Sequence, residues 1–511
     1  MQEVGVALLV TLIMMLTTVS RALASAKVAR PSASLRRVGS VSSTGGLRMC
    51  SSSGRTSAAV TQTKEVKKDK GKFDLSPPRG TRDFFPEDHR LKDWLFGKFR
   101  LIANRYGFEE YDAPVLENEE LYIRKAGEEV TQQLYNFEDK GGRRLSLRPE
   151  MTPSLARMVL SRKNALPLPL KWFAIPQCWR YERTTRGRRR EHYQWNMDIW
   201  GVEGVDAEAE LLSATVACMK EMGLSAGDVG IKINSRKILT GLMTKYGIPE
   251  ENWAPTCVLI DKLEKVPVDA IMDDLTALGL TKEVVEKLLS DLQLQSLEEF
   301  VSVLGEDAEG VQDLQKLFAL AKGYGYEDWL VFDASVVRGL AYYTGVVFEG
   351  FDRTGELRAI FGGGRYDRLL ESMGGEATPA VGFGFGDAVI VELLKNKDLL
   401  PDTSQSRKNV LLYAKGGEGR DMAVKAQALA AATALREAGV TVDVVLEDKK
   451  PKWVFSRADK MGMGCVVICS ADSDGEVGSG GVKVGVKSMT TGEQVDCAAR
   501  EVVATVKGLL E

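Results

Sequence analysis

Histidine is scarce in this chain of 511 residues, which contains only His89 and His192. Two histidines cannot form a multi-histidine metal centre, so an enzyme of that kind is excluded. The seven cysteines include no C-x-x-C pair, which argues against a structural zinc site and against a disulfide framework; they are Cys50, Cys178, Cys218, Cys257, Cys465, Cys469 and Cys497. Cys465 and Cys469 lie in an apolar run, and we expect both to be buried structural residues.

Long apolar runs and an excess of charge of one sign are also missing. The apolar run at residues 4–16 has 13 residues, whereas a membrane-spanning helix needs about 20. Lys and Arg number 68 against 71 Asp and Glu, which excludes a uniformly basic protein that coats nucleic acid. No G-x-x-x-x-G-K-[ST] phosphate loop occurs. The composition, 44% hydrophobic and 27% charged, is that of a soluble globular chain, and its length predicts about three domains.

Acidic residues are absent from one long segment near the N-terminus. Residues 4–64 contain no Asp or Glu but eight Lys or Arg and eleven Ser, a pattern typical of an organellar transit peptide. The apolar run 4–16 and the small residues 22–26 resemble a signal peptide placed ahead of it. We therefore expect residues 1–72 to be a targeting leader and linker, with the plastid as destination. A mitochondrial presequence, dual targeting and a membrane anchor remain alternatives.

Periodicity places the main elements of the remaining chain. A helix is expected at 88–106 and an extended segment at 109–115. Strands at 172–181 and 193–200 flank the basic loop 183–190, which predicts a hairpin. A polar helical insertion is expected at about 250–325, and a Gly-rich strand, turn and helix at 358–395. After residues 401–408 an α/β unit is predicted, with strands at 409–413, 440–446 and 465–469 and helices at 422–438 and 452–461.

The basic loop is the densest chemical signal in the chain. Between Arg180 and Arg190 there are six Arg and one Glu. The planar guanidinium donates two hydrogen bonds at once and keeps its charge, which suits it to phosphate. The alternative is a solvated charged loop, but the strands on both sides favour a phosphate site.

Five motifs together resemble those of class II aminoacyl-tRNA synthetases, and in particular the histidyl-tRNA synthetases. Arg-Tyr-Glu-Arg at 180–183, followed by Gly-Arg-Arg-Arg-Glu-His-Tyr-Gln at 187–194, resembles motif 2. Pro-Arg-Gly-Thr-Arg-Asp at 78–83, Leu-Arg-Pro-Glu-Met-Thr at 147–152 and Val-Arg-Gly-Leu-Ala-Tyr-Tyr-Thr-Gly at 337–345 are similar to further signatures of the family. Residues 108–117 resemble motif 1, which in the family belongs to a dimer interface.

The resemblance covers most of residues 77–511 and implies a fold. It implies an α+β catalytic domain at 73–400 built on the antiparallel sheet of class II synthetases, with the helical insertion inside it. It also implies a C-terminal α/β anticodon-binding domain at 406–511. The basic cluster 449–452 beside Trp453 is compatible with contacts to unpaired bases, although a solvated helix start is an equal alternative.

The resemblance further implies roles for individual residues. Arg180 and Arg338 would be catalytic at the α-phosphate, because activation builds negative charge there. ATP would be bound by Arg180, Glu182 and Arg188. The substrate histidine would be bound by Glu150, Thr152, Gln194, Asp198, Tyr342 and Tyr343. The loop residues facing tRNA would be Arg183, Arg186, Arg189 and Arg190. Glu150 as a helix-start acid and the two tyrosines as core aromatics are the alternatives, and His192 is expected to be structural.

Two positions depart from the family pattern. Motif 3 normally ends Gly-x-Glu-Arg with the Arg on adenine, but this chain has Val389 at that position, and Arg365 cannot be assumed to replace it. Ala341 stands where Asp is more usual. The glycines at 362–364 and at 382, 384 and 386 are expected to let the sheet backbone lie close under a bound adenylate.

These observations predict a homodimeric histidine–tRNA ligase of organellar translation. Its partners would be histidine, tRNA(His) and ATP with Mg²⁺, with no metal held by protein ligands and no stable membrane association. A non-catalytic, synthetase-like regulatory paralogue and a sibling synthetase for threonine, proline or glycine are the rival interpretations.

Overall fold

The computed structural model describes residues 74–123, 131–263, 266–338, 342–403, 409–415, 421–471 and 482–510. The predicted leader at 1–72 lies outside these ranges, as do Cys50 and Ala341. The catalytic part and the C-terminal unit are each described by themselves below.

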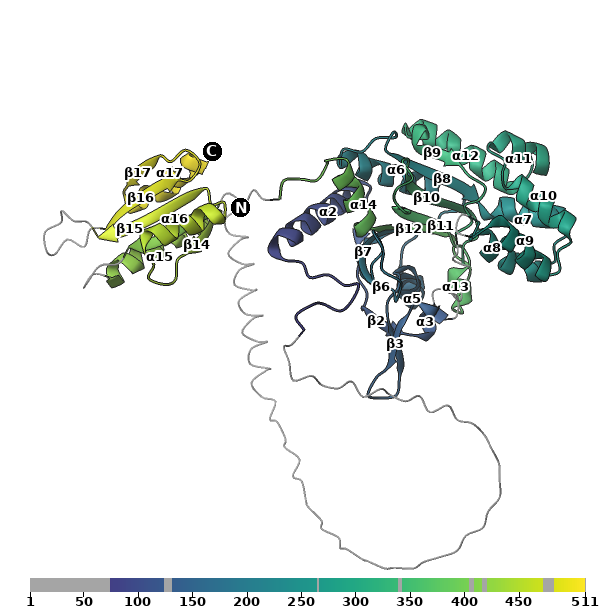
Figure 1. Cartoon of the computed structure of the whole chain (residues 1–511), viewed down its shortest axis with the longest axis horizontal. Helices are drawn as coiled ribbons and strands as arrows, with labels where there is room; N and C mark the ends of the chain where they lie inside the picture. Colours follow the sequence, from purple (N-terminus) through teal and green to yellow (C-terminus); the bar gives the residue numbers. More distant parts are fainter. Residues whose placement is uncertain are drawn as a thin grey trace, which may run out of the picture. The chain divides into compact units, whose positions relative to one another are not determined.

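A mostly antiparallel sheet forms the centre of the catalytic part (Figure 1). Its order is β1 (Glu109–Glu110), β5 (Leu170–Ala174), β7 (Glu191–Trp200), β12 (Ala380–Gly386), β11 (Phe361–Arg365), β10 (Val346–Asp352), β8 (Val229–Ser235) and β9 (Leu330–Phe332), with β6 (Gln177–Trp179) paired to β7. The outer pairs β1–β5 and β8–β9 are parallel. This sheet confirms the predicted class of catalytic domain.

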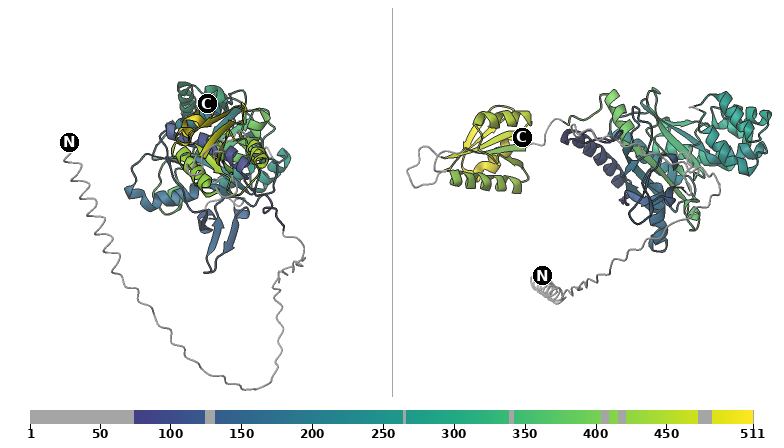
Figure 2. Two further views of the ribbon diagram at one scale, coloured as in Figure 1. Left: turned by 90° about the vertical axis from the view of Figure 1, so that its left-hand side faces the viewer. Right: turned by 60° about the horizontal axis from the view of Figure 1, so that its bottom comes forward.

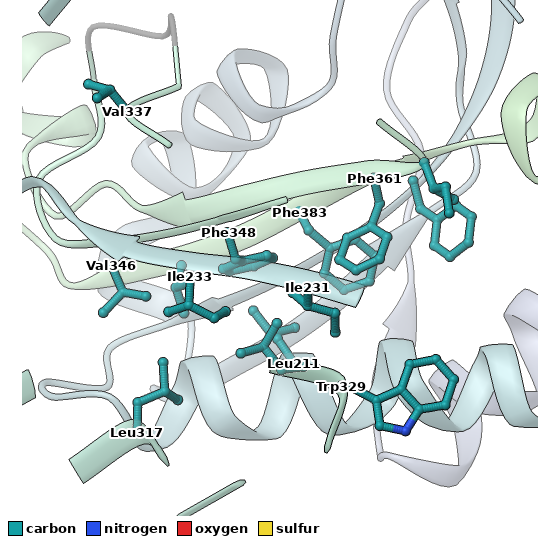
Figure 3. Packing of buried hydrophobic residues seen from close by; sticks show 14 of the residues in the cluster. Leu211, Ile231, Ile233, Leu317, Trp329, Val337, Val346, Phe348, Phe361 and Phe383 are labelled. Atoms are coloured by element: carbon teal, nitrogen blue, oxygen red, sulfur yellow. The ribbon is translucent and has the colours of Figure 1, made fainter. Parts of the chain in front are cut away.

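One face of the sheet packs on three long helices, α2 (Pro86–Arg105), α6 (Asp206–Glu221) and α12 (Glu309–Tyr324). Successive side chains of a strand point to opposite faces, and the apolar set of each strand lies on this side. Figure 3 shows Ile231, Ile233 and Phe348 of the strands among Leu211 of α6 and Leu317 of α12. The alternate residues of the same strands face the other side, where the candidate site lies.

The predicted hairpin around the basic loop is present, but its first strand is broken. Strand β5 ends at Ala174 and β6 begins at Gln177, so the prediction of one strand over 172–181 is wrong. Pro176 has no N–H for the ladder, and its carbonyl instead accepts a hydrogen bond from the Gln194 N–H at 3.0 Å. Strand β7 begins at Glu191, two residues before the predicted start.

Shorter elements complete the catalytic part. A small sheet has the order β2 (Leu116–Asn118), β4 (Arg144–Leu147) and β3 (Tyr135–Glu138). Besides α2 and α6, the helices described outside the predicted insertion are α3 (Glu120–Ile123), α5 (Thr152–Arg162), η1 (Lys163–Ala165), α7 (Arg236–Lys245), α13 (Leu369–Ser372) and α14 (Asp387–Asn396). Helix α14 begins where β12 ends, and it packs on β7.

The region predicted as a helical insertion is helical. Its elements are η2 (Glu250–Asn252), α8 (Trp253–Ile260), α9 (Val268–Ala277), α10 (Lys282–Asp291) and α11 (Leu297–Leu304), followed by α12 and η3 (Glu327–Trp329). Side-chain caps fix two of the helix starts: Thr281 caps α10, and Ser296 with Glu299 forms a capping box on α11. In Figures 1 and 2 these helices gather beside the β8 end of the sheet.

The C-terminal unit is a five-stranded sheet covered by helices on both faces. Its order is β14 (Thr441–Val444), β13 (Asn409–Lys415), β15 (Cys465–Ala471), β16 (Val482–Ser488) and β17 (Gln494–Cys497). On one face, Val410 and Leu412 of β13 pack with α15 (Asp421–Glu437) and α17 (Val502–Leu510). On the other face, Leu411 and Tyr413 pack with α16 (Pro451–Lys460). The short helix η4 (Ala499–Glu501) precedes α17. Cys465 and Cys469 are fully buried and free, as predicted.

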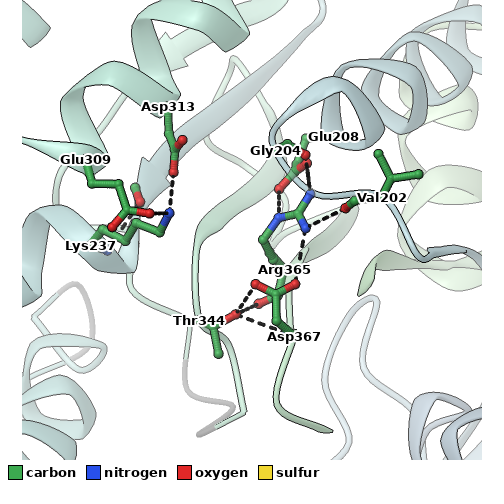
Figure 4. Close-up of polar contacts among 10 residues, drawn as sticks. Val202, Gly204, Glu208, Lys237, Glu309, Asp313, Thr344, Arg365 and Asp367 are labelled. Carbon is green, nitrogen blue, oxygen red and sulfur yellow. Dashed lines mark hydrogen bonds and ion pairs between the residues drawn. The ribbon is translucent and has the colours of Figure 1, made fainter. Parts of the chain in front are cut away.

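Arg365 lies on the helix-covered face of the sheet, in a buried ion pair with Glu208 of α6 (Figure 4). Its Nε and Nη2 donate to the two Glu208 oxygens at 2.7 and 2.6 Å, and Nη1 donates to the Val202 carbonyl at 3.0 Å. The pair fixes β11 to α6. Arg365 is therefore not a replacement for the arginine missing at Val389.

We expect Glu208→Ala to lower the free energy of unfolding by about 3–5 kcal/mol, because it leaves a buried guanidinium without its counter-ion. The control is Glu309→Ala. Figure 4 also shows this residue, which pairs with Lys237, but its side chain is 74% exposed, so its removal should change stability by at most about 1 kcal/mol. Chemical denaturation of both variants measures the difference, and equal losses would contradict this assignment.

Candidate active site

Most of the residues predicted to bind substrate line one cavity of about 720 Å³ on the open side of the sheet. Those in its wall are Glu150, Thr152, Arg180, Glu182, Arg186, Arg188, Arg189, Gln194, Arg338, Tyr342 and Tyr343. Arg183, Arg190 and Asp198 do not line it. The cavity has the size of a small-molecule site, and its wall combines segments that lie far apart in the sequence.

The glycines of β11 and β12 make room for the side chains of the site. A Cβ on Gly382 would overlap Asp198 Oδ1, and one on Gly384 would overlap the Gln194 amide. A Cβ on Gly362 would overlap the Arg338 guanidinium. Antiparallel pairing places Gly382 beside Asp198 and Gly384 beside Asn196. The glycines thus let polar side chains lie flat on the sheet, a role that the sequence analysis did not predict.

Two adjacent glycines give a test of this arrangement. Gly362→Ala should displace the Arg338 guanidinium and lower the rate of the chemical step by about ten-fold or more, with little effect on stability because a flexible side chain yields. Gly363 faces the core, where a Cβ would meet the Gly382 carbonyl and lie 2.7 Å from Phe383 Cβ. Gly363→Ala should instead lower the free energy of unfolding by about 3 kcal/mol. Activity assays measure the rate loss, and chemical denaturation measures the loss of stability. If both variants lost the same property, the two glycines would not face opposite sides of the sheet as described.

Two buried carboxylates belong to the site, Glu150 in the cavity wall and Asp198 beneath the wall at Gly382. Glu150 Oε2 accepts a hydrogen bond from the Tyr342 hydroxyl at 2.9 Å, and Asp198 Oδ1 accepts one from the Tyr366 hydroxyl. Among the described residues, Glu150 Oε1 and Asp198 Oδ2 have no hydrogen-bond partner. Burial raises the pKa of Glu150 and raises that of Asp198 to about 7. The two oxygens without a partner are the acceptors that a ligand with N–H groups would satisfy.

Aromatic and hydroxyl side chains surround these carboxylates. The Tyr342 ring centroid lies 5.0 Å from that of Tyr343 and 5.8 Å from that of Tyr366. Thr152 begins α5 and is buried beside Glu150. Tyr366 was not among the predicted site residues, although it directly follows the Gly-Gly-Gly-Arg run. Its contact with Asp198 depends on the pairing of three strands.

The three arginines predicted to bind the phosphates of ATP lie in the cavity wall, each with a protein partner. Arg180 Nε donates to the Pro149 carbonyl at 2.9 Å, Arg188 pairs with Glu182, and Arg338 pairs with Glu349 of β10. Burial opposes ionisation of Glu182, but the hydrogen bond from Arg188 and the charge of Arg180 leave its pKa lowered. The guanidiniums converge on one space, as an anion such as phosphate requires.

The backbone at Arg338 is strained. Its φ is +59°, a left-handed conformation that non-glycine residues adopt at an energetic cost. The Arg338 carbonyl accepts a hydrogen bond from Arg236 Nη2 at 2.7 Å, which holds this conformation. Strain of this kind clusters at functional sites, and here it positions the predicted catalytic guanidinium.

The four arginines predicted to face tRNA have different surroundings. Arg183 and Arg189 are exposed. Arg186 is held by α14, since it donates to Glu392 at 3.1 Å and to Asn396 at 2.9 Å. The Arg190 guanidinium lies 3.9 Å from the Tyr181 ring centroid, a cation–π contact. Two of the four are thus free to meet a ligand, and two fix the loop.

Several residues at the site were not predicted. Arg82 joins the start of β7 to that of α14, because it pairs with Glu191 at 2.7 Å and with Asp387 at 2.9 Å. His192, expected to be structural, lines the cavity; burial and then nearby arginines lower its pKa to about 3, so it is neutral. Arg358 and the buried Val389 also line the cavity. No role was predicted for Arg82 or Arg358, and the ion pairs of Arg82 join distant segments. His192 and Val389 lie in the motif 2 and motif 3 stretches of the sequence.

The described ranges contain no group of three or more His, Cys, Asp or Glu side chains that could hold a metal ion. Within the same ranges, no helix has the length and apolar character needed to cross a bilayer.

The C-terminal unit has a second, smaller cavity of about 280 Å³. Tyr413, Lys415, Phe455, Lys483 and Asp496 are among its lining residues. The predicted basic cluster precedes Trp453, a residue that is 41% exposed. Lys449 Nζ and Arg457 Cζ lie 5.4 and 5.6 Å from that ring. This unit therefore presents an aromatic ring flanked by cations, which suits contacts to nucleic acid.

Comparisons with known proteins agree with the geometry. The family described as histidyl-tRNA synthetase matches residues 80–387, and the one described as anticodon binding domain matches residues 410–509. A chloroplastic/mitochondrial histidine–tRNA ligase of Arabidopsis thaliana is 55% identical over 423 residues, 83% of this chain and 85% of the relative. One of Opitutus terrae is 38% identical over 84% of this chain and 97% of the relative. The crystal structure of histidyl-tRNA synthetase from Nostoc sp. PCC 7120 superposes with a TM-score of 0.65, at 25% identity, covering 86% of this chain and 100% of that one.

Proposed function

The chain belongs to the histidyl-tRNA synthetase family and is a histidine–tRNA ligase, and from that premise we propose which of its residues carry out the reaction. The observation that carries the proposal is the cavity itself. Glu150 in its wall and Asp198 beneath the wall have oxygens without a partner among the described residues, and Arg180, Arg188 and Arg338 are among the arginines that line it. An amino acid and a nucleotide phosphate need these two environments side by side.

Histidine binds at the carboxylate end. Glu150, Thr152 and Gln194 bind and orient the α-ammonium group. The hydrogen bond from Tyr342 holds the Glu150 carboxylate in place. Asp198 accepts a hydrogen bond from the imidazole, with Tyr343 beside it. A buried acceptor rejects amino acids that lack a matching N–H, because it would remain unpaired.

ATP binds across the arginines. Arg180 and Arg338 hold the α-phosphate from two sides while the histidine carboxylate attacks it and pyrophosphate leaves, and Arg188 binds the γ-phosphate. Glu182 accepts a hydrogen bond from the adenine amine or from a donor in the loop. Because charge develops on the α-phosphate oxygens in the transition state, fixed guanidiniums stabilise that state more than the ground state.

Mg²⁺ bound to ATP would supply positive charge at the triphosphate, and in such sites the ion takes many of its ligands from phosphates. Glu182 and Glu349, the carboxylates beside the arginines, are both engaged by Arg side chains. We therefore assign no protein residue as a dedicated metal ligand.

The tRNA(His) acceptor end meets the loop Arg183, Arg186, Arg189 and Arg190, and the anticodon meets the C-terminal domain. We place the domains at 73–400 and 406–511.

The enzyme is a homodimer through residues 108–117, where Val115 and Leu116 expose 39% and 41% of their surface.

Residues 1–72 direct the enzyme to the plastid, with the mitochondrion as a second destination. The acid-free, Ser-rich composition supports this, as does the name of the Arabidopsis relative. A fluorescent fusion of residues 1–75 tests it by imaging, and a signal confined to the cytosol would refute it.

Charging of a tRNA(His) transcript with radiolabelled histidine, in the presence of ATP and Mg²⁺, tests the proposed function. We expect labelled tRNA(His) and no comparable labelling of a threonine or proline tRNA. Absence of charging, or charging without selectivity, would overturn the proposal.

A further inference from the structure

One arginine in the cavity wall, Arg358, is not among the residues assigned to histidine, ATP or tRNA. Arg358 lies in the connection between β10 and β11, just before Phe361, and its side chain lines the cavity. With the residues that the structure describes, its guanidinium forms no hydrogen bond or ion pair. Arg180, Arg188 and Arg338 each have a protein partner. Of these four arginines, Arg358 is thus the one without a protein partner among the described residues.

Its position is next to the tip of the basic loop and the start of α14. The point where a Cβ on Gly187 would lie is 3.9 Å from Arg358 Cγ and Cδ and 3.3 Å from Val389 Cγ2. The aliphatic part of Arg358 and the Val389 side chain therefore flank the same loop residue. Arg358 brings a guanidinium to the corner of the cavity where α14 contributes only an apolar side chain.

The local charge balance favours an anion at this corner. Six arginines line the cavity against four carboxylates, and two of the carboxylates, Glu182 and Glu349, are already paired with arginine. The arginines are Arg180, Arg186, Arg188, Arg189, Arg338 and Arg358, and the other two carboxylates are Glu150 and Asp261. Partial burial, and then the charges of Arg188 and other neighbours, lower the pKa of Arg358. An arginine held beside like charges, with unused donors, is stabilised when a multiply charged ligand binds.

We propose that Arg358 binds the β- and γ-phosphates of ATP together with Arg188. This inference rests on the proposed function of the cavity as the ATP site. A triphosphate carries enough negative charge to balance the surplus of guanidiniums, and the planar fork of Arg358 can donate two hydrogen bonds to its oxygens. Adenine, which is neutral, would leave the surplus charge unbalanced.

Arg358→Met and Arg358→Lys test the proposal through two ligands. The first is ATP, measured as its KM in histidine-dependent pyrophosphate exchange. The second is a non-hydrolysable histidyl-sulfamoyl-adenosine, which has the adenosine and histidine groups but no β- or γ-phosphate, measured by its Kd. In Arg358→Met we expect the KM for ATP to rise about ten- to a hundred-fold, with the Kd of the analogue and the KM for histidine unchanged. Arg358→Lys, which keeps the charge but loses the fork, should lie in between.

Arg368→Met is the matched control, because Arg368 is 72% exposed and pairs with Glu371 away from the cavity; its KM for ATP should equal that of the unmodified enzyme. An unchanged KM in Arg358→Met would overturn the inference. A parallel loss of analogue binding would also overturn it, since it would place Arg358 at the adenosine. Absence of exchange in the unmodified enzyme would contradict the proposed function instead, so the two failures are distinguishable.

Discussion

Replacing Arg338 by methionine is expected to slow histidine activation by about a thousand-fold while the protein stays folded. The side chain lies in the cavity wall over Gly362, where its guanidinium can reach a phosphate group. Removing one preorganised donor from a developing anion typically costs about 10²–10³ in rate, and a cationic guanidinium at a phosphoryl transition state can contribute more. The loss should fall on kcat in pyrophosphate exchange, with a small change in the KM for histidine.

The variant also frees Glu349, whose carboxylate is paired with Arg338. The double variant Arg338→Met/Glu349→Gln removes that unpaired charge and should remain equally slow. Recovery of activity in the double variant would show that the freed carboxylate, and not the missing guanidinium, causes the defect. Exchange within ten-fold of the unmodified enzyme in Arg338→Met would likewise contradict a catalytic role.

Replacing Asp198 by asparagine should have opposite effects on activity and on stability. Asp198 is buried, and among the described residues its Oδ2 has no hydrogen-bond partner. If this oxygen accepts from the substrate imidazole, an amide in its place weakens the match, and kcat/KM for histidine should fall about a hundred-fold or more. Pyrophosphate exchange measured over a range of histidine concentrations gives this value.

The effect on stability follows from the pKa of Asp198, which burial raises to about 7 from an ordinary value of 3.8. The folded state therefore holds the proton more tightly than the unfolded state does, so the free energy of unfolding falls as pH rises from about 4 to 7. Asparagine cannot ionise and escapes this loss. We expect Asp198→Asn to be more stable than the unmodified protein at pH 8, by up to a few kcal/mol, and little changed near pH 4.

Asp228 provides the control with the opposite sign. The hydrogen bond from Lys397 is the main cause that lowers the pKa of Asp228 to about 2, so its ionised form stabilises the folded state above pH 4. Asp228→Asn should therefore lose stability at pH 7, and this difference should shrink as the pH falls toward 2. Denaturation at several pH values measures both variants. A stability difference for Asp198→Asn that does not change with pH would refute the assigned pKa.

Local patterns were sufficient to find the residues that lie close together in the chain. Glu150 and Thr152 are two residues apart, and Arg180, Glu182 and Arg188 lie within one loop, so motif spacing reveals them. Gln194 and Asp198 share one strand at a spacing that keeps both side chains on the same face. The structure places these residues in or directly beneath one cavity wall.

The remaining contacts depend on the order of the strands, which spacing alone does not determine. Tyr366 meets Asp198 across 168 residues because β12 lies between β7 and β11. Arg82 likewise pairs with Asp387, a residue far away in the sequence that follows β12 at the start of α14. The sequence shows the glycines of β11 and β12, but only the pairing register shows that they clear space for Asp198 and Gln194. The break at Pro176 was visible in the sequence, since proline interrupts a ladder.

Pyrophosphate exchange with a panel of amino acids isolates the activation of histidine in this cavity, because it measures the adenylation step without tRNA. The purified enzyme is incubated with ATP, Mg²⁺ and labelled pyrophosphate, together with histidine, threonine, proline or glycine in turn. The account predicts rapid label exchange into ATP with histidine and background exchange with the other three. No exchange with histidine, or faster exchange with any of the others, would contradict it.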